Sequence, residues 1–89
     1  MPIHVRIVTP AGLFREFDAS ILNVNTVDGQ RGILPRHVPI VTMLKQGMMN
    51  AVDTTDSRKY FELSGGLLYF RDNQAEILTE EIKEKVPAK

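Results

Sequence analysis

The segment Ile3-His4-Val5-Arg6-Ile7 alternates apolar and polar side chains, with the apolar residues at every second position. Successive side chains of a β-strand point to opposite faces, so this alternation is typical of a strand with one buried face. The following residues, Thr9-Pro10-Ala11-Gly12, predict a turn, because proline presets φ at its second position and glycine suits its fourth. A period of two, and not the period of a helix, governs this part of the chain.

Short apolar runs separated by turn signals continue along the rest of the chain. Such spacing is typical of an antiparallel β-sandwich or barrel, so the fold class is predicted as all-β with nine or ten short strands. The expected strands are residues 3–7, 13–17, 21–27, 32–34, 40–44, 48–52, 60–63, 67–71 and 75–79. Asp28-Gly29 predicts a tight hairpin turn, because both residue types tolerate positive φ.

The end of the chain departs from this pattern. Residues 80–85, Glu-Glu-Ile-Lys-Glu-Lys, are the only helical candidate, and they are shorter than the roughly 12 to 15 residues at which an isolated helix becomes marginal. Residues 86–89 predict a frayed end. The expected organisation is a β-domain over residues 1–80 and a polar tail over residues 81–89.

Composition excludes several classes of function. The chain has 89 residues, enough for one domain, and its 11 basic residues balance its 11 acidic residues. This balance removes the basic surface that usually marks a nucleic-acid-binding protein. The absence of cysteine excludes disulfides and thiolate chemistry. No apolar stretch approaches the roughly 18 residues of a membrane span, so membrane association is expected only through a partner.

Residues with catalytic potential occur without the companions that a reaction centre needs. His4 and His37 are the two histidines, and neither has neighbouring residues spaced to complete a metal site. Ser64 lacks the Gly-x-Ser-x-Gly context of a nucleophile, and no phosphate-binding loop occurs. Lys45 lies near methionines, as in carrier domains that present a modified lysine, but is not flanked by them directly. Neither a catalytic residue, a metal nor a cofactor is therefore expected, which favours an interaction module.

One stretch resembles the hallmark segment of ATP synthase ε subunits, which runs approximately Glu-Gly-Glu-Leu-Gly-Ile-Leu-Pro-Gly-His-Ala-Pro-Leu. In this chain it reads Asp28-Gly29-Gln30-Arg31-Gly32-Ile33-Leu34-Pro35-Arg36-His37-Val38-Pro39-Ile40. Three further blocks agree in order and spacing with that family. They are Val5-Arg6-Ile7-Val8-Thr9-Pro10-Ala11-Gly12, Leu44-Lys45-Gln46-Gly47, and Phe61-Glu62-Leu63-Ser64-Gly65-Gly66-Leu67-Leu68 followed by Ile77-Leu78-Thr79. The resemblance covers about residues 3 to 80.

The resemblance implies a fold, a role and two sets of contact residues. The family's domain is a flattened sandwich of two five-stranded sheets that joins the γ shaft to the membrane ring of c subunits, while catalysis takes place on the β subunits. Residue by residue, His37, Val38, Pro39 and Thr42 are expected to contact γ. The turn with Asp28, Gln30 and Arg31 is expected to face the c ring. The implied location is the cytoplasmic side of a bacterial plasma membrane, with the stromal side of a thylakoid as the alternative.

Three residues and the length of the chain depart from the family pattern. Gln30 and Arg31 make the c-ring turn less acidic than usual, and Arg36 stands where the family has glycine. If that position needs positive φ, Arg36 is strained by about 1 kcal/mol; otherwise its backbone is ordinary. Most members continue into a C-terminal helical hairpin that inhibits ATP hydrolysis, so this sequence is expected to lack hairpin-type inhibition.

Two other functions remain as alternatives. One is a separate β-sandwich module that recruits an unrelated protein, which binding to γ in a one-to-one ratio would distinguish from a rotor subunit. The other is a small enzyme or carrier domain that uses His37, Asp28 or Lys45. A modified lysine would appear in the intact mass, and His37→Ala would abolish any turnover.

Overall fold

A computed structural model describes residues 1–85, which form strands and no helix; residues 86–89, for which a frayed end is predicted, lie outside the described part. The predicted all-β fold is confirmed. The strands are β1 (Ile3–Thr9), β2 (Gly12–Thr26), β3 (Gly29–Ile33), β4 (Ile40–Leu44), β5 (Gly47–Asp53), β6 (Arg58–Leu63), β7 (Gly66–Arg71), β8 (Gln74–Leu78) and β9 (Ile82–Lys85).

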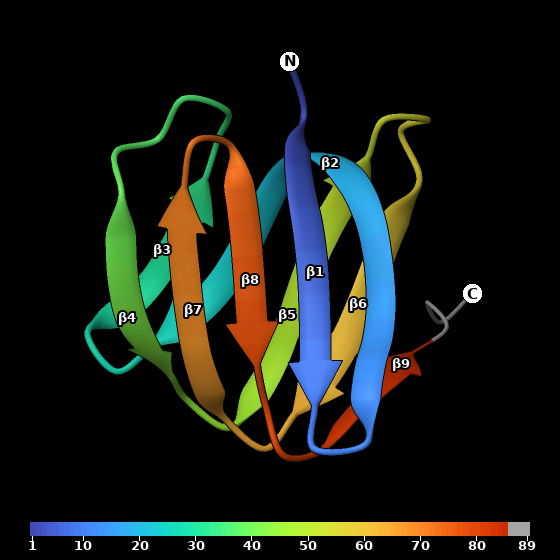
Figure 1. Cartoon of the computed structure of the whole chain (residues 1–89), viewed down its shortest axis with the longest axis vertical. Coiled ribbons are helices and arrows are strands. Elements are labelled where there is room, and N and C mark those ends of the chain that lie inside the picture. Colours follow the sequence, from blue (N-terminus) through green and yellow to red (C-terminus); the bar gives the residue numbers. More distant parts are fainter. Residues whose placement is uncertain (86–89) are drawn as a thin grey trace.

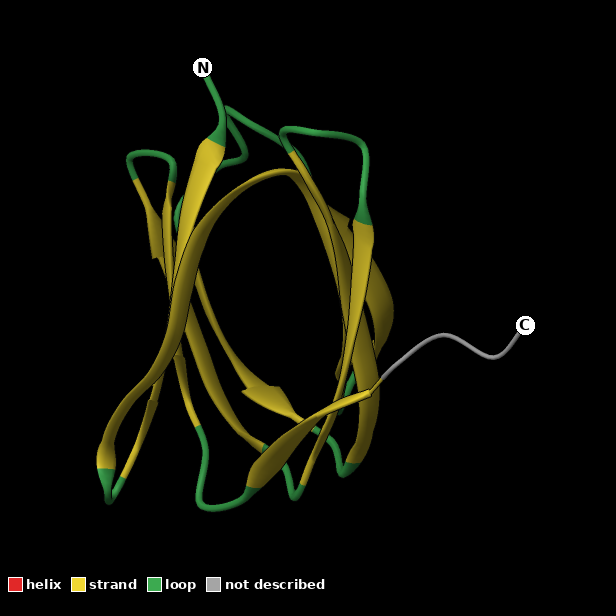
Figure 2. Cartoon of the chain, turned by 90° about the vertical axis from the view of Figure 1, so that its right-hand side faces the viewer, coloured by secondary structure: helices red, strands yellow, loops and turns green. Residues whose placement is uncertain are grey.

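The strands form two layers that face each other across the core (Figures 1 and 2). The first layer contains β4, β7, β8, β1 and the beginning of β2; the second contains β3, the end of β2, β5, β6 and β9. Within residues 1–85 each layer therefore has five strands when β2 is counted in both, as the family resemblance implies. Neighbouring strands are antiparallel except β1 and β8, which run parallel.

Strand β2 connects the layers and is one element where two are predicted. Its first half pairs with β1 and its second half with β3 and β5 (Figure 1). The register shifts opposite β1 at Phe14 and opposite β5 at Ser20. Such β-bulges bend a strand and increase its twist, which lets β2 leave one layer for the other without a break. Asp18-Ala19-Ser20 therefore belongs to the bent strand, whereas the sequence predicts a break there between strands at residues 13–17 and 21–27.

The core lies between the layers and is apolar. Phe61 and Phe70 are its largest fully buried side chains. Phe61 stacks against Phe17 with ring centroids 6.0 Å apart and meets Phe14 edge-on at 6.5 Å. Burying an aromatic side chain of this kind contributes about 1.5–3 kcal/mol, so these rings join the start of β2 firmly to β6 in the opposite layer.

The helical candidate at residues 80–85, judged too short from its sequence, is not a helix, because Ile82–Lys85 forms strand β9. β9 pairs antiparallel with β6, with Ile82 opposite Leu63 and Lys85 opposite Tyr60. Ile82 packs against the core, while the Nζ of Lys85 lies 3.1 Å from a carboxylate oxygen of Glu62. A single helical turn has one hydrogen bond to offset its nucleation cost, whereas β6 offers a ready edge to pair with.

The hairpin between β2 and β3 turns one residue earlier than predicted. Thr26 pairs with Gly29, so Val27 and Asp28 form the centre of the turn. Gly29 has a φ of +117°, whereas Asp28 is not among the residues with positive φ. The buried Thr26 hydroxyl donates to the Gly29 carbonyl at 2.7 Å and accepts from the Asp28 amide at 3.1 Å, which fixes the turn.

The glycine pair after β6 serves a close approach of the backbone. A Cβ on Gly66, whose φ is +146°, would lie 2.0 Å from the Leu78 carbonyl oxygen. The Thr79 hydroxyl donates to the Gly65 carbonyl at 2.6 Å in the same region. Ser64 accepts a hydrogen bond from the Glu81 amide at 3.1 Å, so its hydroxyl has a structural partner.

Candidate interaction surface

Strand β4 is apolar on both of its faces, yet only one face is buried. Leu44 is in the core and Ile40 packs against it, whereas Val41 and Met43 are 60% and 61% exposed. β4 lies at the edge of the first layer, with β7 on one side and a single pairing to β2 on the other. A strand that is apolar on a solvent-facing side is unusual for a protein surface and indicates an interaction site.

The exposed apolar side chains of β4 continue across the outer face of the first layer. The strand register places one apolar residue of each strand in a single row. From β4 to β2 this row is Met43, Leu67, Leu78, Val8 and Leu13. Val41 and Tyr69 form the start of a second row beside it. These seven residues are called the apolar face below.

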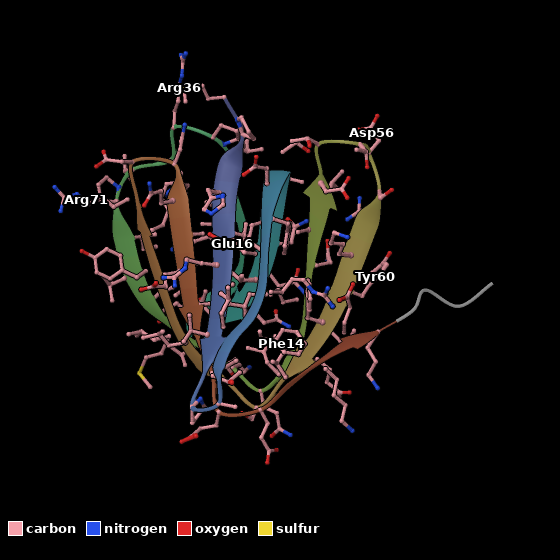
Figure 3. All side chains as sticks on the ribbon, turned by 45° about the vertical axis from the view of Figure 1, so that its right-hand side comes forward. Phe14, Glu16, Arg36, Asp56, Tyr60 and Arg71 are labelled. Atoms are coloured by element: carbon pink, nitrogen blue, oxygen red, sulfur yellow. The ribbon has the colours of Figure 1, made fainter. Side chains whose placement is uncertain are left out.

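Charged side chains complete the second row beyond Tyr69. Glu76 of β8, Arg6 of β1 and Glu16 of β2 follow in register, and the Arg6 guanidinium donates to Glu76 at 2.9 Å. Figure 3 shows Glu16 on this side of the molecule. A docking surface with an apolar centre and a charged rim is typical of specific protein interfaces.

His4 lies beside these charges with both ring nitrogens engaged. Its Nδ1 is 2.8 Å from an Asp18 carboxylate oxygen and its Nε2 is 2.5 Å from one of Glu16. The hydrogen bond to Asp18, followed by that to Glu16, raises the pKa of His4 above its ordinary value of 6.5. His4 is thus an ion-paired residue of the outer face, in agreement with its predicted place on the polar side of β1.

The loop from Leu34 to Pro39 carries three of the four predicted γ contacts. The His37 amide donates to the Leu34 carbonyl at 3.0 Å, which closes a turn with Pro35 and Arg36 at its centre. The His37 ring meets Phe70 edge-on at 5.8 Å, and its Nδ1 lies 2.7 Å from the Val38 carbonyl oxygen. Val38 is 70% exposed and Pro39 is exposed as well.

Thr42, the fourth predicted γ contact, does not share the face of its neighbours. It is half-buried and alternates with the exposed Val41 and Met43 along β4. Prediction from sequence missed the apolar face, because the run from Ile40 to Leu44 looks like a strand buried on both faces. Four apolar side chains in the five residues Ile40–Leu44 are a partial signal of it, because one buried face of a strand does not account for all of them.

The predicted c-ring residues are exposed at the opposite end of the molecule. Asp28 lies in the β2–β3 turn, and Gln30 and Arg31 follow on β3. This turn lies at the lower left of Figure 1, whereas the loop with His37 lies at the top. The two predicted contact sets are therefore separated by the length of β3, and Asp28 cannot act together with His37 in one reaction centre.

Within residues 1–85, no three histidine, aspartate or glutamate side chains are grouped so as to hold a metal ion. The same residues include no helix that is long and apolar enough to cross a membrane. The most developed feature of the described surface is the apolar face with its charged rim. Fold and surface together define a β-sandwich domain with an exposed apolar face.

The chain belongs to the family described as ATP synthase, Delta/Epsilon chain, beta-sandwich domain, whose family model matches residues 2–85. Its relatives include the ATP synthase epsilon chain of Chloroflexus aggregans, 35% identical over 83 residues, and that of Halalkalibacterium halodurans, 38% identical over 78 residues. These alignments cover 93% and 88% of this chain but 59% and 58% of the relatives. The chain thus spans somewhat less than three-fifths of their length.

Two solved assemblies contain a chain with the same fold. One is the OSCP/F1/c-ring part of the Euglena gracilis mitochondrial ATP synthase, with a TM-score of 0.86, 19% identity, and coverage of 93% of this chain and 53% of that one. The other is the central stalk/c-ring of the Tetrahymena thermophila enzyme, with a TM-score of 0.78, 20% identity, and coverage of 93% and 66%.

Proposed function

We propose that the chain is a non-catalytic rotor subunit of an F-type ATP synthase, which joins the γ shaft to the c ring. The observation that carries this proposal is the apolar face, which is uncovered in the chain alone. Family membership supports the choice of partner, because the relatives are epsilon chains of ATP synthases. In this role the domain makes no chemical bond; it holds two parts of the rotor together so that ion flow becomes torque.

The γ subunit binds the apolar face and the loop above it. Five residues of the face, Val41, Met43, Leu13, Tyr69 and Leu78, are each more than 40% exposed and lose water when they are covered. Burial of apolar surface yields about 25 cal/mol per Å², which makes this face the stronger of the two outer surfaces for docking. The outer face of the second layer is lined in part by amides, where the Asn23 side chain donates to Asn50 at 3.0 Å.

The loop with His37, Val38 and Pro39 extends this contact. Its conformation is fixed by the turn hydrogen bond, by the ring of His37 against Phe70, and by an amide hydrogen bond from Arg36 to the Asn73 side chain at 2.6 Å. A loop that is ordered before docking loses less entropy on binding. Val38 supplies the exposed apolar side chain, whereas Thr42, which is half-buried on β4, contributes at the margin of the contact.

The c ring meets the β2–β3 turn. Asp28, Gln30 and Arg31 are exposed there and suit a polar contact more than an apolar one. The turn is hydrogen-bonded to β4, which contributes Val41 and Met43 to the apolar face, since the Val27 amide donates to the Met43 carbonyl at 3.0 Å. Load on the turn therefore passes directly into β4. Through these contacts the chain is held at the cytoplasmic side of a bacterial membrane.

Native mass spectrometry of the chain mixed with its cognate γ subunit tests this function. We expect a one-to-one complex. No complex with a well-folded γ subunit would contradict the proposal and would favour a module that recruits an unrelated protein. The c-ring contact has its own test, because Arg31→Glu reverses a charge of the turn and is expected to weaken binding to the isolated ring while binding to γ is unchanged.

A further inference from the structure

A pocket of about 450 Å³ opens at the end of the sandwich where three turns meet. Its walls come from the end of β1 and the following turn, from the turn between β6 and β7, and from the end of β8. They include Val8, Pro10, Ser64, Gly65, Leu78 and Thr79. The volume lies in the range of about 300–1,000 Å³ that is usual for sites that enclose a small molecule or a large side chain.

Most of the wall is apolar, and its three side-chain hydroxyls take part in hydrogen bonds within the chain, while Glu80 adds one charged side chain to the wall. Thr79 donates to the Gly65 carbonyl at 2.6 Å, and the Ser64 hydroxyl accepts from the Glu81 amide at 3.1 Å. The Thr9 hydroxyl accepts from the Ala11 amide at 3.2 Å. The apolar part of the wall, with Val8, Pro10 and Leu78, offers a polar guest no hydrogen-bond partner, which costs free energy. An apolar guest loses nothing of this kind.

The pocket is continuous with the apolar face. Val8 and Leu78, which are neighbours in the β1–β8 register, belong both to the apolar row and to the pocket wall. A partner that covers the row therefore also covers this part of the pocket wall. Interfaces of this design concentrate their binding energy in a few large side chains that fill pockets and are surrounded by a seal of weaker contacts.

We propose that this pocket receives one large apolar side chain of the γ subunit and is the anchor point of the docking face. The inference rests on the proposed function, since it names γ as the partner. It adds a specific site within the face: the row of apolar side chains excludes water, and the filled pocket supplies most of the affinity and fixes the register of docking.

The proposed anchor site can be tested with a cysteine introduced at the pocket wall. Because the chain contains no cysteine, this thiol is the one group that a thiol reagent modifies. Leu78→Cys is treated with methyl methanethiosulfonate or with benzyl methanethiosulfonate, which add a small group or a ring to the same atom. We expect the benzyl adduct to bind γ about tenfold or more weakly than the methyl adduct, because the ring occupies the pocket. Met48→Cys, on the outer face of the second layer, receives the same two reagents as the control and is expected to show no difference.

A second readout uses the unmodified thiol. In the complex, the γ side chain should shield the thiol of Leu78→Cys, so its reaction with the benzyl reagent should be slower than in the free chain. Equal affinity of the two adducts at position 78, or an unchanged reaction rate in the complex, overturns the inference. Either result also counts against the coverage of Leu78 by γ. The rotor function itself stands as long as the unsubstituted chain binds γ, whereas failure of the unsubstituted chain to bind overturns that function. Thermal unfolding of each variant establishes that it is folded.

Discussion

Arg36 holds a left-handed backbone conformation, with a φ of +71°, at the third position of the turn from Leu34 to His37. A turn with proline at its second position and positive φ at its third usually has glycine there, because a Cβ crowds the backbone in this region. The side chain points outward from the upper end of the molecule (Figure 3). The first of the two alternatives for Arg36, a strained residue, is therefore correct.

Replacing Arg36 by glycine should stabilise the protein. Relief of the left-handed strain, about 1–2 kcal/mol, is partly offset by the greater freedom of glycine in the unfolded chain, which leaves a net gain of up to about 1 kcal/mol. The hydrogen bond from the residue 36 amide to Asn73 does not involve the side chain and is retained. Urea unfolding measures the gain, and Arg58→Gly, within a strand, serves as a control that should lose stability. A lower urea midpoint for Arg36→Gly would contradict this account.

His4 should make stability depend on pH. Because Asp18 and Glu16 raise its pKa in the folded state, the charged imidazole stabilises the fold. This contribution is fully present below the unfolded pKa of about 6.5 and is lost as the pH rises through the raised folded value. Comparing the melting temperatures of the wild type and His4→Gln between about pH 5.5 and 8.5 should give a difference that shrinks as the pH rises. A difference that stays constant or grows would be inconsistent with the pairing.

At the scale of the element, β2 decides how the two layers are joined. Its inward-facing side chains do not keep a strict period of two. Phe14 and Phe17 both contact Phe61 although three positions separate them, because the bulge at Phe14 restores it to the inner face. Leu13, the preceding residue, remains 52% exposed on the apolar face.

Adjacent substitutions on β2 should separate stability from binding. Phe14→Ala removes a half-buried ring from the core and should cost about 1–3 kcal/mol, less than the 3–5 kcal/mol of a fully buried phenylalanine. Leu13→Ala should change stability by no more than about 0.5 kcal/mol but weaken binding to γ. Chemical denaturation and isothermal titration measure the two effects. Equal losses of stability for both variants would mean that the bulge does not sort these side chains as described.

The elements that sequence predicted well are those whose alternation is uninterrupted. In β1, Ile3, Val5 and Ile7 are all buried, as a period of two requires. The joined strand β2 was missed because Asp18 and Ser20 are residue types that also form turns, and a bulge leaves no local signature. The parallel pairing of β1 with β8 depends on partners about 70 residues apart, which periodicity does not encode.

The exposed surface was predictable from sequence only where it depends on local structure. The exposure of Val38 and of the β2–β3 turn follows from their place in loops. The apolar face could not be predicted in the same way, since it arises only when five strands bring one apolar residue each into register. The strand β9 was missed for a related reason, because a four-residue polar segment becomes a strand only through the edge of β6.

At the scale of the whole molecule, the sandwich has two unlike outer faces. The first layer presents the apolar face, and the second presents polar side chains such as Asn23 and Asn50. The molecule measures 31 × 28 × 26 Å, so a partner that covers one layer leaves the other free. Asp28 in the β2–β3 turn and Arg31 on β3 are remote from the loop with His37, so the two proposed contacts do not overlap (Figure 1).

The most direct test of the account compares one substitution on the two outer faces. Met43 on β4 and Met48 on β5 are both exposed, at 61% and 44%, but they lie on opposite layers. Met43→Glu places a charge in the apolar face and should weaken binding to γ about tenfold or more in isothermal titration, whereas Met48→Glu should leave the dissociation constant unchanged. Loss of binding only for Met48→Glu, or equal binding by both variants, would contradict docking through the apolar face.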